Sequence, residues 1–127
     1  MEQQREQINY VEYAAEQLEE TKRFFEQLLD WHFTEWGTDY IDTHPQPISL
    51  GFYRAPLASK SEQGAALLAF YSPTLERSQE RVIEAGGTIT KPTFSFPGGR
   101  RFHFCEPSGN EFAIWSDVDV SGTSLSD

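Results

Sequence analysis

The sequence predicts an α+β fold in which two tandem βαβββ modules form a curved mixed sheet with a concave cleft. Segments in which apolar and polar residues alternate, as in half-buried strands, flank two segments whose apolar residues recur with helical spacing. The second half of the chain also repeats the first when moved back by 57 positions, which sets Leu75 on Leu18 and Phe70 on Tyr13. Because one module alone would leave a sheet face uncovered, the two halves are expected to pack together in one domain.

The first module is expected over residues 8–54. Its helix is predicted at 17–29, where Leu18, Phe25 and Leu28 lie on one face. One strand rich in aromatic and β-branched residues precedes this helix, and three shorter strands follow it, separated by turn residues. These strands are expected at residues 8–14, 31–36, 40–43 and 48–53. Residues 54–63 are then expected to form a linker or a mobile loop.

The second module is expected over residues 64–117. A buried strand at 64–71 leads to a helix with Ser72 as its N-cap, Pro73 at its first position and Gly86-Gly87 at its end. Further strands are predicted at 88–90, 101–105 and 111–115, and the turn at 106–110 joins the last two as a hairpin. Residues 118–127, rich in Ser, Gly and Asp, are expected to be a flexible tail.

Composition excludes several classes of partner. The chain of 127 residues carries 20 Asp and Glu against 10 Lys and Arg, a formal charge of −10, so nucleic acids and anionic membranes are not expected partners. No apolar run approaches the ~20 residues of a membrane span, and the polar start lacks the apolar segment of a secretory signal. Cys105 is the only cysteine, so no internal disulfide can form. A soluble, cytoplasmic protein is expected.

Two segments and the module pattern resemble a known family. The first helix begins Leu-Glu-Glu-Thr-Lys-Arg-Phe-Phe at Leu18, and the chain later runs Glu-Pro-Ser-Gly-Asn-Glu-Phe-Ala-Ile-Trp from Glu106. Together with the paired modules, they resemble the vicinal-oxygen-chelate superfamily, which contains glyoxalase I, the bleomycin-resistance proteins and the extradiol dioxygenases. The resemblance covers residues 8–116 and implies either a metalloenzyme or a metal-free binding protein, with a homodimer as the assembly.

The resemblance also assigns positions to a metal site. Metal-dependent members place a His in the first strand and a Glu in the last strand of each module, and the matching residues here are Tyr10, Gly51, Leu67 and Ala113. None of these is an ordinary ligand of a divalent metal. We therefore expect the usual metal site to be absent, and no cofactor is expected.

Strand alternation predicts which side chains face the cleft, because residues two apart in a strand share a face. The almost wholly apolar set expected under the helices comprises Val11, Tyr13, Leu50, Phe52, Leu68, Phe70, Phe112 and Ile114. The cleft is then expected to contain an aromatic-lined hollow with one histidine, two carboxylates and a guanidinium, from Tyr10, Glu12, Tyr53, Arg101, His103, Glu111 and Trp115. The short hairpin predicts that Arg101, His103 and Cys105 lie beside Trp115, Ala113 and Glu111, respectively.

His103 is the most suggestive of these residues. It is a candidate general base, with Glu12 or Glu111 to orient it, although a histidine hydrogen-bonded across the strands for stability is an equal alternative. Glu12 and Glu111 are alternatively salt-bridge partners of Arg100 or Arg101, or, with His103, ligands of a relocated iron or manganese site. A Cys105–His103 nucleophile pair is disfavoured, because side chains two apart in a strand stand about 6 to 7 Å from each other.

The aromatic residues point to ligand binding. Tyr10, Tyr53 and Trp115 could stack a planar ligand, or they could pack at a module or subunit interface. The segment 94–101 combines two Phe, turn glycines and two arginines, so it could close over an anionic ligand with Arg100 or Arg101 pairing to a carboxylate or phosphate. A plain hairpin connection would have the same composition.

Two functional hypotheses follow, with a third beside them. The first is a metal-independent protein that binds an unknown small molecule, for which the net acidity favours a cationic or neutral ligand. The second is an enzyme, either a glyoxalase-like lyase or isomerase with His103 as base, or a metal-dependent lyase or dioxygenase with a relocated site. The third is a structural or regulatory dimer without a ligand.

Overall fold

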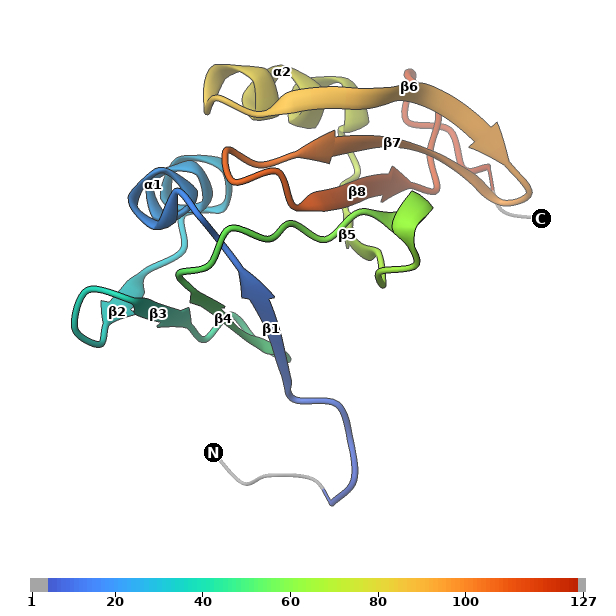
Figure 1. The fold of residues 1–127 in the computed structure, drawn as a ribbon. Coiled ribbons are helices and arrows are strands. Elements are labelled where there is room, and N and C mark those ends of the chain that lie inside the picture. Colours follow the sequence, from blue (N-terminus) through green and yellow to red (C-terminus); the bar gives the residue numbers. More distant parts are fainter. Residues whose placement is uncertain (1–4, 126–127) are drawn as a thin grey trace.

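The computed structural model describes residues 5–125 and shows two modules with the same order of elements (Figure 1). The first consists of β1 (Tyr10–Ala14), α1 (Leu18–Leu29), β2 (Phe33–Glu35), β3 (Tyr40–Thr43) and β4 (Ser49–Tyr53). The connection contains a short 3-10 helix, η1 (Ser61–Gln63), and the second module consists of β5 (Leu68–Tyr71), α2 (Leu75–Glu84), β6 (Thr88–Phe96), β7 (Gly99–Cys105) and β8 (Glu111–Ser116). Both helices begin at the leucines that the internal repeat aligns.

Each module contributes a four-stranded mixed sheet. In the first sheet the strand order is β1-β4-β3-β2, and in the second it is β5-β8-β7-β6. The first strand of each module pairs in parallel with the last, and the remaining pairs are antiparallel. The predicted tandem α+β fold is confirmed, and its curved surface is built from two sheets.

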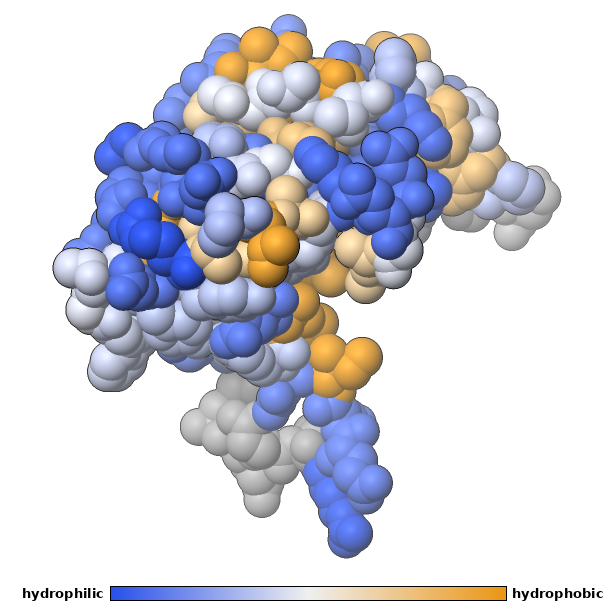
Figure 2. Space-filling model, viewed as in Figure 1, coloured by the Kyte–Doolittle hydropathy of each residue, from blue (hydrophilic) through white to orange (hydrophobic). Residues whose placement is uncertain are grey.

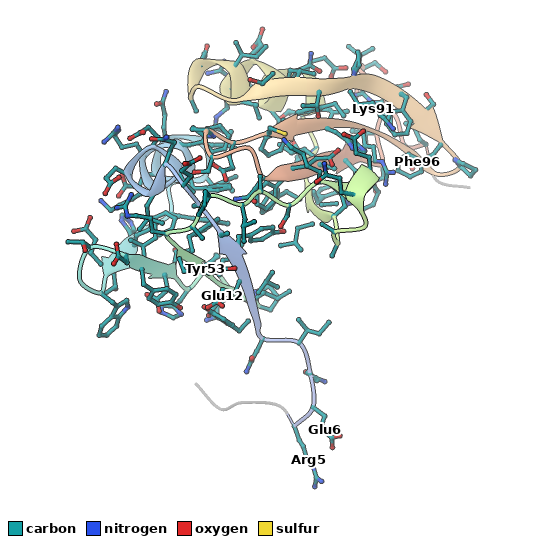
Figure 3. The ribbon with its side chains drawn as sticks, in the orientation of Figure 1. Arg5, Glu6, Glu12, Tyr53, Lys91 and Phe96 are labelled. Atoms are coloured by element: carbon teal, nitrogen blue, oxygen red, sulfur yellow. The ribbon has the colours of Figure 1, made fainter. Side chains whose placement is uncertain are left out.

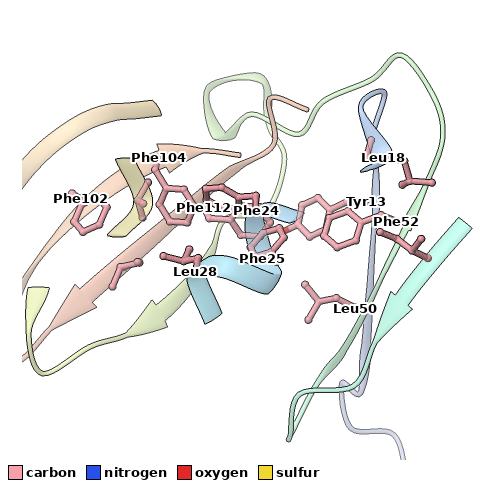
Figure 4. Packing of buried hydrophobic residues seen from close by; sticks show 14 of the residues in the cluster. Tyr13, Leu18, Phe24, Phe25, Leu28, Leu50, Phe52, Phe102, Phe104 and Phe112 are labelled. Atoms are coloured by element: carbon pink, nitrogen blue, oxygen red, sulfur yellow. The ribbon is translucent and has the colours of Figure 1, made fainter. Parts of the chain in front are cut away.

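The two modules share one aromatic core (Figure 4). The ring of Phe112 on β8 lies 5.0 Å from that of Tyr13 on β1 and 5.4 Å from that of Phe25 on α1, measured between centroids. Phe25 is also 5.7 Å from Phe52 on β4, so α1 packs against residues of both sheets. Neither module keeps a complete core without the other.

The predicted alternation of the strands is confirmed by burial. Tyr13, Leu50, Phe52, Phe112 and Ile114 are all buried, with exposed fractions of 4 % or less, and the three other residues expected under the helices are partly buried against the same cluster. The opposite faces of β1, β4, β7 and β8 therefore carry the predicted polar and aromatic set.

Two elements at the start of the second module, β5 and α2, begin later than predicted. β5 begins at Leu68 rather than at residue 64. α2 begins at Leu75 instead of Pro73, because the Ser72 hydroxyl accepts a hydrogen bond from the Thr74 amide at 3.1 Å and so closes a turn before the helix. At the other end the helix stops as predicted, with Gly86 at φ 103°.

β6 is much longer than predicted, since it continues past Thr90 to Phe96. Pro92, which has no amide hydrogen, falls where the pairing with β7 shifts register between Lys91 and Phe94. An edge strand tolerates such a break. The segment 94–101 is therefore two strand ends joined by a tight turn at Pro97-Gly98, so Phe94, Phe96 and Arg101 are held by a sheet.

One face of the molecule is mostly polar. Figure 2 shows hydrophilic residues over most of this face, with apolar residues at its top, near its centre and where the amino-terminal segment joins the body. In the segment predicted as a flexible tail, Val118 bridges to Ser124, and Asp119 accepts hydrogen bonds from the amides of Ser121 and Thr123; residues 126 and 127 lie outside the described part. No described helix is long and apolar enough to cross a membrane.

Candidate functional site

The hairpin between β7 and β8 sets the geometry of the candidate site. Its length fixes the register in which Arg101 pairs with Trp115, His103 with Ala113 and Cys105 with Glu111, as the sequence predicts. All these side chains belong to the face of the second sheet that is turned away from the aromatic core. The site therefore rests on paired strands, with residues supplied by β6, β7, β8 and η1.

His103 and Glu111 form a hydrogen-bonded pair. The Nδ1 atom of His103 lies 2.8 Å from the Glu111 carboxylate, whose other oxygen accepts hydrogen bonds of 2.7 Å from the amide and the hydroxyl of Ser61. Burial raises the pKa of Glu111, but the bonds from His103 and Ser61 outweigh it and hold that pKa at about 2. An ionised Glu111 favours the tautomer with the proton on Nδ1, which leaves Nε2 of the neutral ring as a hydrogen-bond acceptor.

The Nε2 atom of His103 is buried and has no hydrogen-bond partner among residues 5–125. The residue as a whole is only 3 % exposed, and the ring of Phe94 lies 5.8 Å from its imidazole. Buried polar atoms are nearly always satisfied, by protein, water or ligand. This atom is thus available to a group that the chain itself does not supply.

Arg101, two residues before His103 on the same face, shows the same feature. Its Nε atom is also buried without a partner in the described chain. The guanidinium carbon lies 5.3 Å from the centroid of Phe94 and 5.7 Å from that of Phe96, while Trp115 contacts Phe96 and Tyr71. Aromatic rings therefore surround a guanidinium, and an indole adjoins them (Figure 3 labels Lys91 and Phe96 on β6).

Arg100 and Arg101 have different surroundings. The Arg100 guanidinium pairs with Glu76 on α2, and its Nε donates to the carbonyl of Val118 at 2.8 Å. This pairing lowers the pKa of Glu76. Arg100, one of the two arginines predicted as ligand contacts, thus interacts with α2, and Arg101 is the one that lies on the face of the candidate site. The predicted salt bridges of Glu12 or Glu111 with these arginines are not formed among the described residues, since Glu111 bonds His103 and Glu12 bonds Tyr10.

Part of the connection at residues 54–63, which was expected to be a linker or a mobile loop, lines the site. The Lys60 ammonium donates to the carbonyl of Gly109 at 2.7 Å and lies 3.3 Å from the Cys105 sulfur, and Ser61 holds Glu111. A pocket of about 310 Å³ lies here, lined by Lys60, Ser61, Glu62, Thr90, Lys91, Cys105 and Glu111. No pattern in the sequence of this connection signals its role, because its contacts are made by single side chains.

Tyr10, Glu12 and Tyr53 do not lie in this site. They belong to the first sheet, where the Tyr10 hydroxyl bonds to Glu12 at 2.8 Å and to the hydroxyl of Tyr40. Figure 3 shows Glu12 and Tyr53 well apart from Lys91 and Phe96. The residues predicted to line one cleft therefore form two groups, one on each sheet. Of the two carboxylates predicted to orient His103, Glu111 contacts it, whereas Glu12 bonds to Tyr10.

The four positions that the resemblance assigns to metal ligands do not fit a metal. Burial and the hydrogen bonds with Tyr40 and Glu12 raise the pKa of Tyr10 well above its ordinary value of 10.0, which disfavours a phenolate ligand. A Cβ atom at Gly51 would collide with the Tyr10 hydroxyl, and Leu67 and Ala113 carry no donor atom. Within the described range, no three His, Cys, Asp or Glu residues are grouped so that they could hold a metal ion, which includes the relocated set of Glu12, His103 and Glu111.

Comparison with known proteins agrees with this architecture. The family model described as the Glyoxalase/Bleomycin resistance protein/Dioxygenase superfamily matches residues 7–114. No curated protein matches the chain in sequence. Among solved structures, a glyoxalase/bleomycin resistance protein/dioxygenase family enzyme from Burkholderia phytofirmans PsJN superposes with a TM-score of 0.71 at 16 % identity, covering 85 % of this chain and 96 % of that one.

Two other solved structures are similar to a comparable degree. A glyoxalase-related enzyme from Fulvimarina pelagi has a TM-score of 0.69 at 19 % identity, with coverage of 94 % of this chain and 96 % of that one. A lactoylglutathione lyase from Agrobacterium tumefaciens has a TM-score of 0.67 at 12 % identity, with coverage of 87 % and 93 %. Identities this low establish a common fold and leave the activity to the residues of the site.

Proposed function

The chain belongs to the glyoxalase/bleomycin resistance protein/dioxygenase superfamily, and from this premise we propose that it is a metal-independent protein that binds a small molecule. The ligand lies on the face of the second sheet that carries His103, Arg101 and Trp115. One observation carries the proposal: the Nε2 atom of His103 and the Nε atom of Arg101, neighbours on that face, are both buried without a partner in the described chain. A ligand with an acceptor for the Arg101 Nε–H and a donor for Nε2 of His103 would satisfy both.

The aromatic residues support binding of a ring-containing molecule. The ring of Trp115 contacts those of Phe96 and Tyr71, and Phe94 and Phe96 both lie against Arg101. The pocket of about 310 Å³ is linked to these rings through Lys91, which lines the pocket and lies over Phe94. Sites for small molecules typically combine such an apolar lining with a few fixed polar groups. Metal independence is proposed because the donor set at the four family positions does not suit a metal ion.

The proposed assembly is a homodimer in the cytoplasm. The resemblance implies the dimer, and a second copy would be one source for residues such as Tyr10, Glu12 and Tyr53 at the same cleft, since one chain leaves them on the other sheet. A single buried cysteine, Cys105, suits a reducing compartment. Sedimentation as a monomer at micromolar concentration would contradict the dimer.

The His103–Glu111 pair supports a second candidate function. A carboxylate that fixes the proton on Nδ1 leaves Nε2 as a base, which is the arrangement that general-base catalysis uses. The alternative is therefore a glyoxalase-like lyase or isomerase in which His103 removes a proton from a carbon next to a carbonyl group. The hydrogen bond of 2.8 Å between the two side chains is the observation that favours it.

Replacing His103 with Ala separates the two functions. If the chain only binds, the affinity for a ring probe such as benzamide falls a few-fold, since one hydrogen bond contributes about 1 kcal/mol. If His103 is a base, exchange of solvent deuterium into acetophenone, catalysed by the native chain, falls about 100-fold or more. Nuclear magnetic resonance (NMR) measures both quantities on metal-free protein with a chelator present.

The matched control is His32→Ala, which removes an exposed histidine from the segment before β2. It should change neither quantity. Unaltered benzamide binding in the His103→Ala variant, with no deuterium exchange catalysed by the native chain, would remove His103 from both hypotheses.

A further inference from the structure

The charge of the candidate site is opposite to that of the whole chain. The chain has twice as many carboxylates as Lys and Arg side chains, and in residues 5–125 six of the ten cationic side chains form ion pairs: Arg5, Lys22, Arg23, Arg54, Arg77 and Arg100. Of the four others, Arg81 donates to the carbonyl of Leu28 on the helix side of the fold. The remaining three are Lys60, Lys91 and Arg101, and all three belong to the candidate site.

Such a distribution is informative because carboxylates are in excess. Unpaired cations would be expected to attract some of the surplus acidic side chains, yet two of these three lie against Phe94 instead, with Lys91 at 5.4 Å and Arg101 at 5.3 Å from its centroid. The third, Lys60, donates to a backbone carbonyl. Their charges are therefore not neutralised by ion pairs within the described chain.

The acidic residues of the same site do not offset these charges directly. Glu111 accepts hydrogen bonds from His103 and Ser61, and Glu62 is an exposed residue of η1 at the wall of the pocket. Neither forms an ion pair with Lys60, Lys91 or Arg101 in the part of the chain that the structure covers. Exposed charges such as that of Glu62 are strongly screened by solvent and salt.

We propose that the ligand is a planar anion, an aromatic carboxylate that also carries a hydroxyl or amino group. Its carboxylate binds at Arg101 and Lys91, its ring lies against Phe94, Phe96 and Trp115, and the hydroxyl or amino group donates to Nε2 of His103. This inference rests on the proposed function and adds the class of ligand. A guanidinium presents paired N–H donors that match the two oxygens of a carboxylate. The Nε donor of Arg101 lacks a partner, and the rings beside it provide the apolar surface that a planar molecule would cover.

The edge strand β6 allows such a ligand to enter. Phe94 covers part of the guanidinium and lies against His103, so it must shift for a ligand to reach either nitrogen. It follows the register break at Pro92, where the ladder between β6 and β7 is interrupted. The pairing resumes at Phe94, opposite Arg101, so access requires rotation of the Phe94 side chain rather than movement of the strand.

The test compares three probes that share one ring and nearly one shape but differ in charge: benzoate, benzamide and benzamidine. Each is titrated into isotope-labelled protein while the NMR signals of the Arg101 Nε–H and of the indole of Trp115 are followed. A ring of this size is expected to bind with a dissociation constant on the order of 1 mM, so the titration runs to about tenfold above it. Acetate and inorganic phosphate serve as anions without a ring.

Benzoate is expected to bind tightest, benzamide more weakly and benzamidine not at all, with acetate and phosphate far weaker than benzoate. In Arg101→Gln the affinity for benzoate falls about tenfold or more, and in Lys91→Gln, at an exposed position, it falls a few-fold. Arg77→Gln, which removes the same charge from an exposed face of α2, should leave it unchanged. Lys91→Gln keeps the test decisive if Arg101→Gln does not fold.

Each other outcome contradicts the inference. Equal binding of benzoate and benzamide at this site would overturn the anionic ligand and leave the proposed binding function standing. Phosphate as strong as benzoate would overturn the aromatic ligand. If no ring probe moves the signals of Arg101 or Trp115, both the inference and the proposed function fail.

Discussion

Replacing Asn110 with Ala lowers the free energy of unfolding by about 3–5 kcal/mol, because several buried polar groups lose their partner at once. Asn110 is fully buried. Its amide nitrogen donates to the carbonyl of Ala14 at 2.7 Å and to Glu106 at 2.6 Å, and its oxygen accepts from the amide of Ser59 at 2.8 Å. These bonds join the hairpin of the second module to β1 and to Ser59 in the connection at 54–63.

Glu106 makes this effect larger. Burial raises the pKa of its carboxyl, and bonds from Thr21, Ser108 and Asn110 counteract that rise. Loss of Asn110 removes one of the groups that solvate the buried carboxyl. Urea denaturation measures the change, with Arg23→Ala on the exposed face of α1 as control, for which a change within about 0.5 kcal/mol is expected. A loss below about 1 kcal/mol for Asn110→Ala would show that the hairpin does not hold the modules together.

Replacing Phe112 with Ala lowers the free energy of unfolding by a similar amount, about 3–5 kcal/mol. Phe112 has no exposed surface, and its ring contacts Tyr13 and Phe25 of the first module as well as Phe70 and Phe104 of the second. The cavity left by the ring therefore lies where both modules meet. The two modules of this variant should still unfold in one transition, at a lower denaturant concentration than in the native chain, since they share this core.

Circular dichroism and tryptophan fluorescence together test this expectation, because Trp31 belongs to the first module and Trp115 to the second. Ile83→Ala, at a side chain that is 56 % exposed on α2, is the control and should have a small effect. Separate transitions in the native chain would contradict a shared core.

The local pattern of apolar and polar residues along the chain predicted much of this fold. The alternation of apolar and polar residues assigned the faces of β1, β4, β5 and β8 correctly, since burial of one face fixes the register of a strand. The short hairpin likewise predicted that His103 and Glu111 lie on adjacent strands, where they form a hydrogen bond. Both predictions depend on geometry within a strand or between neighbours in sequence.

Other features depend on tertiary packing and could not be predicted in this way. Alternation places Glu12 on an exposed face but does not say that this face belongs to a separate sheet from that of His103. The role of residues 58–63 comes from Lys60 and Ser61, whose contacts lie about fifty positions away in sequence. The local positive charge around Arg101 also differs from the net charge, which had favoured a cationic or neutral ligand.

The metal content of the purified chain tests the central claim, metal-independent ligand binding, most directly. Untagged protein purified without chelators is analysed by elemental mass spectrometry, before and after incubation with nickel, zinc, manganese and ferrous iron. We predict a stoichiometry near zero in each case, together with benzoate binding that a chelator does not change. About one metal ion per chain, or binding that a chelator abolishes, would contradict the claim and make His103 and Glu111 the first ligands to replace.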